Sequence, residues 1–171
     1  MEPSWWLSAL VLVLPMYFAN STAMLFGGST PLDLEYKAWD KRPWLGKGKT
    51  FKGTFFGVFF GTLSAVIISY LVPQTTATMT PNYVLLGFLV SVGAIIGDIA
   101  KSFAKRRMNF ESGAEVFGLD QLDFLAGGLI FGWLLFQPSL EQILFLTVLS
   151  VIVHKVANVI AFRAKLKNVP W

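Results

Sequence analysis

Three aspartates mark the points where apolar sequence meets polar sequence. Asp98 lies near the end of one apolar stretch, and Asp120 and Asp123 lie one helical turn apart at the start of the next. The two stretches flank one short connection, so the three carboxylates can meet at a common depth. Carboxylates without a neighbouring thiol or histidine suit a hard cation, Mg²⁺ before Mn²⁺ or Ca²⁺, that also binds phosphate oxygens. We therefore predict that Asp98, Asp120 and Asp123 are catalytic and bind one or two Mg²⁺ ions.

Basic side chains follow Asp98 at helical spacing. Lys101, Ser102 and Lys105 stand three, four and seven residues after this aspartate, so they share its face if the helix continues past the membrane boundary. Lysine and arginine neutralise phosphate oxygens, and we predict that Lys101 and Lys105 are catalytic. Ser102 and Arg106 are predicted to bind the substrate. The alternative is an ion pair between Asp98 and Lys101 within the helix, with the basic residues serving only to anchor the topology.

A second basic segment, residues 43–53, lies between the first two apolar stretches. Its glycines would let backbone amides approach a phosphate at the start of the following helix, and Lys49, Thr50 and Lys52 are predicted to bind the substrate. The segment is not a Walker A motif, because Pro43 stands where the first glycine is required and no strand precedes it. The alternative is a solvated linker whose lysines set the membrane orientation.

The composition indicates a membrane protein. Of 171 residues, 54% are hydrophobic and only 14% are charged, and the mean hydropathy is +0.60. A water-soluble domain would carry nearly twice this charged fraction. The chain has no cysteine and one histidine, which excludes disulfides, thiolate metal sites and zinc sites with two imidazoles. The pI of about 9.4 is explained by membrane topology and an anionic ligand, so no nucleic-acid partner is expected.

The apolar stretches predict an all-α bundle of five transmembrane helices in one domain, residues 1–171. The spans are expected at about residues 4–26, 54–72, 82–100, 124–137 and 139–162. Two prolines and a threonine-rich stretch predict a loop at residues 73–82, and a turn is expected at residues 137–139. Residues 27–53 and 101–123 would form the active-site loops.

The basic residues orient this bundle in the lipid bilayer. They lie in the first loop, the third loop and the tail: Lys37, Lys41, Arg42, Lys47, Lys49, Lys52; Lys101, Lys105, Arg106, Arg107; Arg163, Lys165, Lys167. The second and fourth loops contain no lysine or arginine. The positive-inside rule then predicts an outer N-terminus, a cytoplasmic C-terminus and an active site on the cytoplasmic side of the cell membrane.

Carboxylates and two basic segments on one face of a membrane bundle are typical of phosphoryl or nucleotidyl transfer to a lipid-borne acceptor. The motifs Gly97-Asp98, Ser102-x-x-Lys105-Arg106 and Asp120-x-x-Asp123 resemble the core signature of the phosphatidate cytidylyltransferase superfamily, the CDP-diacylglycerol synthases. The chain departs from that signature at three places: Glu111-Ser112 for a Lys-Asp pair, Val116-Phe117-Gly118 for a Pro-Gly-His-Gly-Gly run, and Gln121 for an arginine.

Nearly the whole chain resembles the archaeal branch of this superfamily, the CDP-archaeol synthases. The resemblance is carried by the short length, the five spans, residues 42–53 and the run Leu119-Asp120-Gln121-Leu122-Asp123-Phe124. It implies a Mg²⁺-dependent cytidylyltransferase of archaeal phospholipid biosynthesis. Its substrates would be CTP and a membrane ether-lipid phosphate, unsaturated archaetidic acid, and its products CDP-archaeol and pyrophosphate.

Two other functions remain as alternatives. The CDP-alcohol phosphotransferases also combine membrane spans, clustered aspartates and Mg²⁺, but their last two aspartates are four residues apart, whereas Asp120 and Asp123 are three apart. A small cation carrier would place Asp98 on an ion path, with His154 and Lys155 in the last span as further polar positions. In both alternatives the carboxylates within or beside the membrane spans would serve the function.

Overall fold

The computed structural model describes residues 4–165, so Lys167 of the predicted basic tail lies outside the described residues. These residues form the helices α1 (Trp5–Leu25), α2 (Phe51–Leu71), α3 (Pro73–Met79), α4 (Tyr83–Arg107), α5 (Leu119–Gly132) and α6 (Leu140–Arg163). Within that range there is no β-strand, only two isolated bridges in the segment between α1 and α2. The predicted all-α fold is confirmed.

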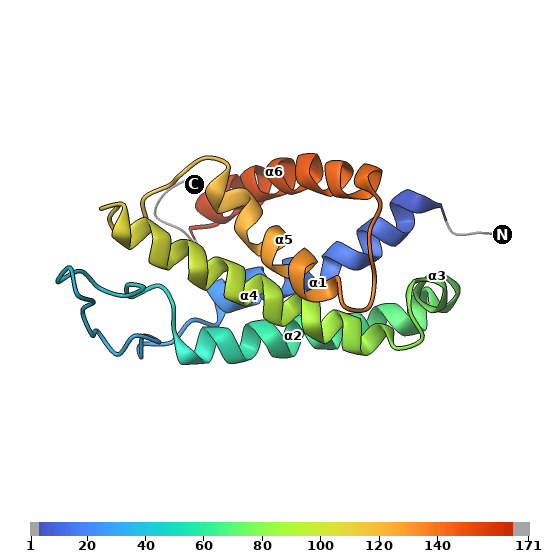
Figure 1. Cartoon of the computed structure of the whole chain (residues 1–171), viewed down its shortest axis with the longest axis horizontal. Coiled ribbons are helices and arrows are strands. Elements are labelled where there is room, and N and C mark those ends of the chain that lie inside the picture. Colours follow the sequence, from blue (N-terminus) through green and yellow to red (C-terminus); the bar gives the residue numbers. More distant parts are fainter. Residues whose placement is uncertain (1–3, 166–171) are drawn as a thin grey trace.

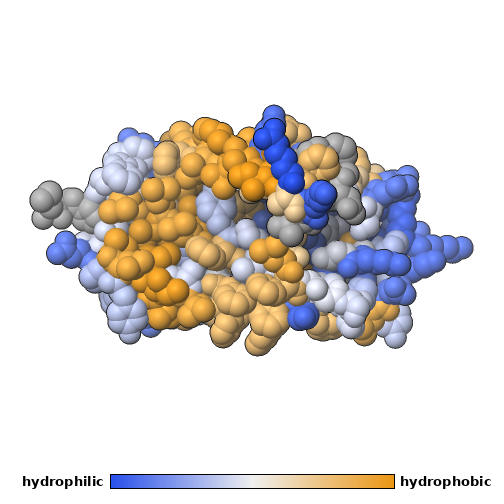
Figure 2. All heavy atoms as spheres, turned by 180° about the vertical axis from the view of Figure 1, so that it is seen from behind, coloured by the Kyte–Doolittle hydropathy of each residue, from blue (hydrophilic) through white to orange (hydrophobic). Residues whose placement is uncertain are grey.

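Within residues 4–165, four helices are long and apolar enough to cross a membrane: α1, α2, α4 and α6. They run along the long axis of the molecule (Figure 1). Many large apolar side chains face outward, such as Phe55 on α2 and Ile130 on α5, which are 63% and 70% exposed. Figure 2 shows hydrophobic residues over the middle of one face, and hydrophilic residues at the end that carries the long loops. The protein is therefore a multi-pass membrane protein.

The long helices lie where the sequence predicts spans, with one extension. Helix α4 does not end at residue 100 but continues to Arg107, so the first part of the predicted loop 101–123 is helical. This segment contains no glycine or proline, and its last turn holds three basic residues that complement the helix dipole. The extension confirms that Asp98, Lys101, Ser102 and Lys105 share one helix.

Two short helices differ from the sequence-based expectation. The predicted loop 73–82 contains α3, which begins with Pro73 in the first helical turn, where proline is favoured. Helix α5 spans 14 residues, or roughly 21 Å at 1.5 Å per residue, shorter than a bilayer core. It begins five residues before the start of the predicted span 124–137, and it ends five residues before the end of that span. The fourth of the five predicted crossings, at residues 124–137, thus stays a prediction.

Glycines bring α4 and α5 into backbone contact. A Cβ atom on Gly97 would lie 2.2 Å from the carbonyl oxygen of Asp123, and one on Gly127 would lie 2.1 Å from that of Gly93. The same device joins α1 and α2, where a Cβ on Gly57 would lie 2.9 Å from the Ala19 carbonyl oxygen. Small residues allow such approach between membrane helices. The α4–α5 contact holds Asp98 opposite the start of α5.

Filling the α4–α5 contact is expected to destabilise the protein. Gly127→Val would make side-chain atoms overlap with the Gly93 backbone. This overlap should lower the free energy of unfolding by about 1–3 kcal/mol, which would appear as a lower melting temperature in detergent. Ala126→Val is the matched control, because Ala126 is exposed on the same helix. Equal melting temperatures for the two variants would contradict this packing.

Candidate active site

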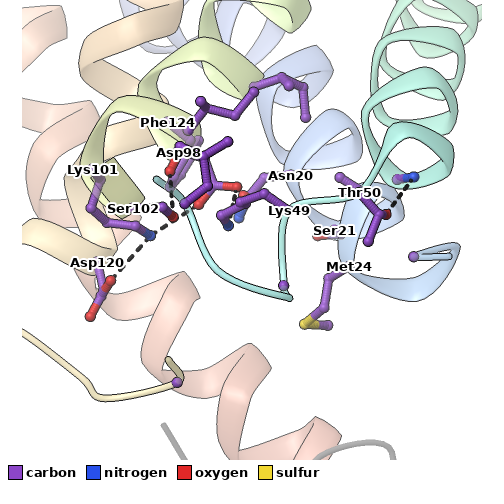
Figure 3. Close-up of a pocket in the computed structure, with 18 of the residues that line it drawn as sticks. Asn20, Ser21, Met24, Lys49, Thr50, Asp98, Lys101, Ser102, Asp120 and Phe124 are labelled. Carbon is purple, nitrogen blue, oxygen red and sulfur yellow. Dashed lines mark hydrogen bonds and ion pairs between the residues drawn. The ribbon is translucent and has the colours of Figure 1, made fainter. Parts of the chain in front are cut away.

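A cavity of about 680 Å³ opens at the end of the bundle that carries the long loops. Its wall is built from α1, α4, the start of α5, α6 and the loops before α2 and before α5. Figure 3 shows side chains from α1, α4 and α5 directed into it. The volume falls in the usual range for a small-molecule site, about 300–1,000 Å³. The lining combines charged, neutral polar and apolar side chains.

One ammonium group joins the three predicted carboxylates. Lys101 Nζ lies 3.0 Å from Asp98 Oδ1, 3.1 Å from Asp120 Oδ1 and 2.8 Å from Asp123 Oδ2. All three contacts are ion pairs. The Lys101 side chain is 12% exposed and that of Asp123 only 4%. The structure therefore brings Asp98, Asp120 and Asp123 around a single cationic position.

Two further lysines complete this cluster. Lys49 Nζ, from the loop before α2, donates to Asp98 Oδ2 at 2.5 Å. Lys105 Nζ lies 2.9 Å from both carboxylate oxygens of Asp120 and also donates to the Ala114 carbonyl. Three lysines thus neutralise three aspartates, which lowers the cost of burying charge at this depth. We call these six side chains the charge cluster: Lys49, Asp98, Lys101, Lys105, Asp120, Asp123.

The charge cluster contains oxygen ligands of the kind that bind metal ions, but a lysine ammonium lies between them. Among residues 4–165 no group of three or more His, Cys, Asp or Glu side chains is arranged as a ready metal site. Lys101 takes the shared position instead. Carboxylate oxygens from three aspartates nevertheless form a donor set that Mg²⁺ prefers. A divalent cation could use these oxygens only if the Lys101 ammonium moved away from them.

The other predicted substrate-binding residues differ in position. Thr50 lines the cavity, but its hydroxyl accepts the Gly53 amide at 3.1 Å and caps α2. Ser102 lines the cavity and donates to the Asp98 carbonyl at 3.0 Å, within α4. Arg106 is buried and faces the cavity. Lys52 does not line the cavity, and its ammonium lies instead 5.9 Å from the centre of the Phe56 ring.

Asp33 stabilises the conformation of the basic loop, the segment between α1 and α2. No motif in the sequence predicted this role. Its Oδ2 accepts the amides of Leu45 at 2.9 Å and Gly46 at 3.0 Å, and its Oδ1 accepts that of Glu35 at 3.2 Å. Partial burial acts to raise the pKa of the Asp33 carboxyl, but the Gly46, Leu45 and Glu35 amides outweigh it and keep the pKa below its usual range. This turn precedes Lys49 and directs it toward the cavity.

Arg107 fixes the same loop to the end of α4. Its Nη1 lies 2.7 Å from Asp40 Oδ1, and its Nη2 donates to the Pro43 carbonyl at 2.5 Å. The guanidinium also lies 5.5 Å from the Trp39 ring centre and 5.1 Å from that of Phe103. These contacts join two segments more than sixty residues apart, and no local spacing in the sequence indicates them.

A further part of the cavity wall is polar and comes from α1 and α6. Asn20 and Ser21 of α1 line the cavity together with His154 and Asn158 of α6, which are joined by a 3.1 Å hydrogen bond. His154 therefore faces the cavity, at a position that the sequence singled out only under the cation-carrier alternative. A sequence signal exists, because Ser150, His154 and Asn158 repeat every four residues on α6.

A charged cavity embedded at one end of a multi-pass helical protein defines a membrane enzyme that acts on an anionic substrate. Comparison with known proteins then gives the family. The CarS-like family model, CDP-archaeol synthase, matches residues 4–171. The chain is similar to the CDP-archaeol synthase of Methanocaldococcus jannaschii, with 40% identity over 96% of each chain. It is 42% identical to that of Pyrococcus abyssi, over 93% of this chain and 94% of the relative.

A solved structure agrees with the sequence relatives. It is described as an intramembrane enzyme for archaeal membrane lipid biosynthesis, and it matches with a TM-score of 0.82 and 30% identity over 90% of this chain and 94% of its own. The chain belongs to the CDP-archaeol synthase family and is a nucleotidyltransferase. The predicted resemblance is confirmed, and the phosphotransferase and carrier alternatives are not supported.

The Asp33 contacts predict the order of the basic loop. Asp33→Ala removes the carboxylate that accepts three backbone amides of this loop. Hydrogen bonds to a charged group stabilise a folded segment, so without them the loop should open more often and trypsin should cleave its lysines about tenfold faster. Glu35→Gln is the control, since it removes a neighbouring exposed charge and leaves the Asp33 carboxylate in place. Cleavage of Asp33→Ala at the wild-type rate would show that Asp33 does not order the loop.

Proposed function

We propose that this protein transfers CMP from CTP to the phosphate of a membrane ether lipid, unsaturated archaetidic acid, giving CDP-archaeol and pyrophosphate. The observation that carries this proposal is the charge cluster, which combines oxygen ligands for a cation with three lysines at one end of a membrane bundle. The matched relatives, which carry the name CDP-archaeol synthase, supply the choice of substrates.

We further propose five membrane crossings, with the cavity on the cytoplasmic side of the cell membrane and the N-terminus outside. The start of α1 and the end of α6 lie at opposite ends of the molecule (Figure 1), which fits an odd number of crossings. Helix α5 and the non-helical residues 133–139 together would supply the short fourth crossing. The basic loops lie at the cavity end, as the positive-inside rule requires of a cytoplasmic face.

The reaction is a displacement at phosphorus. An oxygen of the lipid phosphate attacks the α-phosphorus of CTP, a new P–O bond forms, and the bond to the β-phosphate oxygen breaks so that pyrophosphate leaves. The lipid phosphate is already anionic near neutral pH, so no general base is required. Lys49, Lys101 and Lys105 would neutralise the phosphate oxygens and align the two substrates, and Arg106 would support them.

A divalent cation completes the proposed chemistry. Asp98, Asp120 and Asp123 would hold Mg²⁺, as their donor set allows. When bound, Mg²⁺ supplies positive charge to the triphosphate oxygens. Ser102 and Thr50 remain substrate-binding candidates by their place in the cavity wall, although both hydroxyls already form hydrogen bonds within the protein.

Formation of a CDP-lipid is the direct test of this function. Purified protein with labelled CTP, Mg²⁺ and either ether or ester phosphatidic acid should convert the ether lipid preferentially. Asp120→Asn and Asp123→Asn should each lower turnover at least about 100-fold, because each removes a charged oxygen ligand of the proposed cation, while Glu141→Gln on the exposed α6 surface should not. Near wild-type turnover in both aspartate variants would remove them from the site.

The two predicted lysines near the start of α2 should differ. Lys49→Ala is expected to lower kcat/KM for CTP about 100-fold, because Lys49 belongs to the charge cluster. Lys52→Ala should change it by less than about threefold, since an exposed cation over a ring contributes little. Equal losses in the two variants would mean that the whole segment binds the substrate.

A further inference from the structure

We propose that Lys101 occupies the cation position of the free enzyme and exchanges partners when substrate arrives, so that metal ion and nucleotide bind cooperatively. In this scheme the Lys101 ammonium leaves the three carboxylates and moves to a nucleotide phosphate as the divalent cation takes the carboxylates. The inference rests on the proposed function and adds an order to its binding steps.

The first support is the geometry of the contacts. One atom, Lys101 Nζ, lies within 3.1 Å of an oxygen from each of the three aspartates, on two helices. Figure 3 shows this side chain between Asp98 and Asp120. A metal ion that used the same oxygens would have to occupy the space that the ammonium fills. The two cations therefore exclude each other.

The second support is the balance of charge. Lys49, Lys101 and Lys105 neutralise the three aspartates, and the side chains of the cluster are between 4% and 23% exposed. A metal ion alone would displace Lys101 and leave its ammonium without a partner in a buried place, which is strongly unfavourable. A triphosphate alone would bring negative charge next to the aspartates. Bound together, the two ligands give every charged group a partner.

Lys101 differs in this respect from the other two lysines. Within the described part of the chain, the Lys49 ammonium pairs with Asp98 alone, and that of Lys105 contacts Asp120 and the Ala114 carbonyl, so each lies at the edge of the cluster. Lys101 also lines the cavity, and its long flexible side chain can reach a ligand there while its backbone stays in α4. No helix movement is required for the exchange.

The test measures Mn²⁺ binding to the full-length protein in detergent by electron paramagnetic resonance, with and without a non-hydrolysable CTP analogue. In the wild type, the analogue should raise the Mn²⁺ affinity at least about tenfold, and Mn²⁺ should raise the analogue affinity by the same factor. Lys101→Met should raise the Mn²⁺ affinity without nucleotide at least about tenfold and abolish most of this coupling. Lys105→Met, which removes one charge from the edge of the same cluster, should have a clearly smaller effect.

Several outcomes would overturn the inference. They are tight Mn²⁺ binding to the wild type without nucleotide, equal effects of Lys101→Met and Lys105→Met, or no change in Lys101→Met. The wild-type coupling can be measured even if Lys101→Met fails to fold, which size-exclusion chromatography would reveal. Coupled binding without any CDP-lipid product would contradict the proposed function alone, whereas full activity without coupling would contradict this inference alone.

Discussion

Buried charges of opposite sign pair at the end of α4, and this pairing sets how α4 and α5 lie against each other. Lys101 is held by carboxylates from its own helix and from α5, and its side chain is only 12% exposed. An unpaired charge at such a position would be strongly destabilising. The two helices must therefore keep their register, and the glycine contact between Gly97 and the Asp123 carbonyl keeps them close enough to do so.

The loops extend this arrangement from a pair of helices to a binding site. Asp33 and Arg107 shape the loop before α2 and attach it to α4, which carries Lys49 to Asp98. The segment before α5 is attached in turn, because Lys105 binds the Ala114 carbonyl. Each basic segment thus contributes to one cavity, in which charged side chains come from α4, α5 and the loop before α2, and other polar side chains come from α1 and α6.

The sequence predicted the parts that follow a helical period. The shared face of Asp98 and Lys101 and the pair Asp120 and Asp123 depend only on spacing within single helices, and the four long spans depend only on apolar length. The sequence led us to expect the three carboxylates at a common depth, but it could not predict that one ammonium lies between them, since that depends on how α5 packs on α4. The Asp33 turn has no periodic signal either, because it uses residues with positive φ, such as Glu35.

Asp98, Asp120 and Asp123 are proposed to share one cation position, filled by Lys101 or by a metal ion. A crystal structure with Mn²⁺ and a non-hydrolysable CTP analogue would locate the metal ion by its anomalous signal. We expect a peak at coordinating distance, about 2.1–2.2 Å, from oxygens of these aspartates, with Lys101 Nζ on a phosphate. A peak elsewhere, or Lys101 still between the three carboxylates, would contradict this proposal.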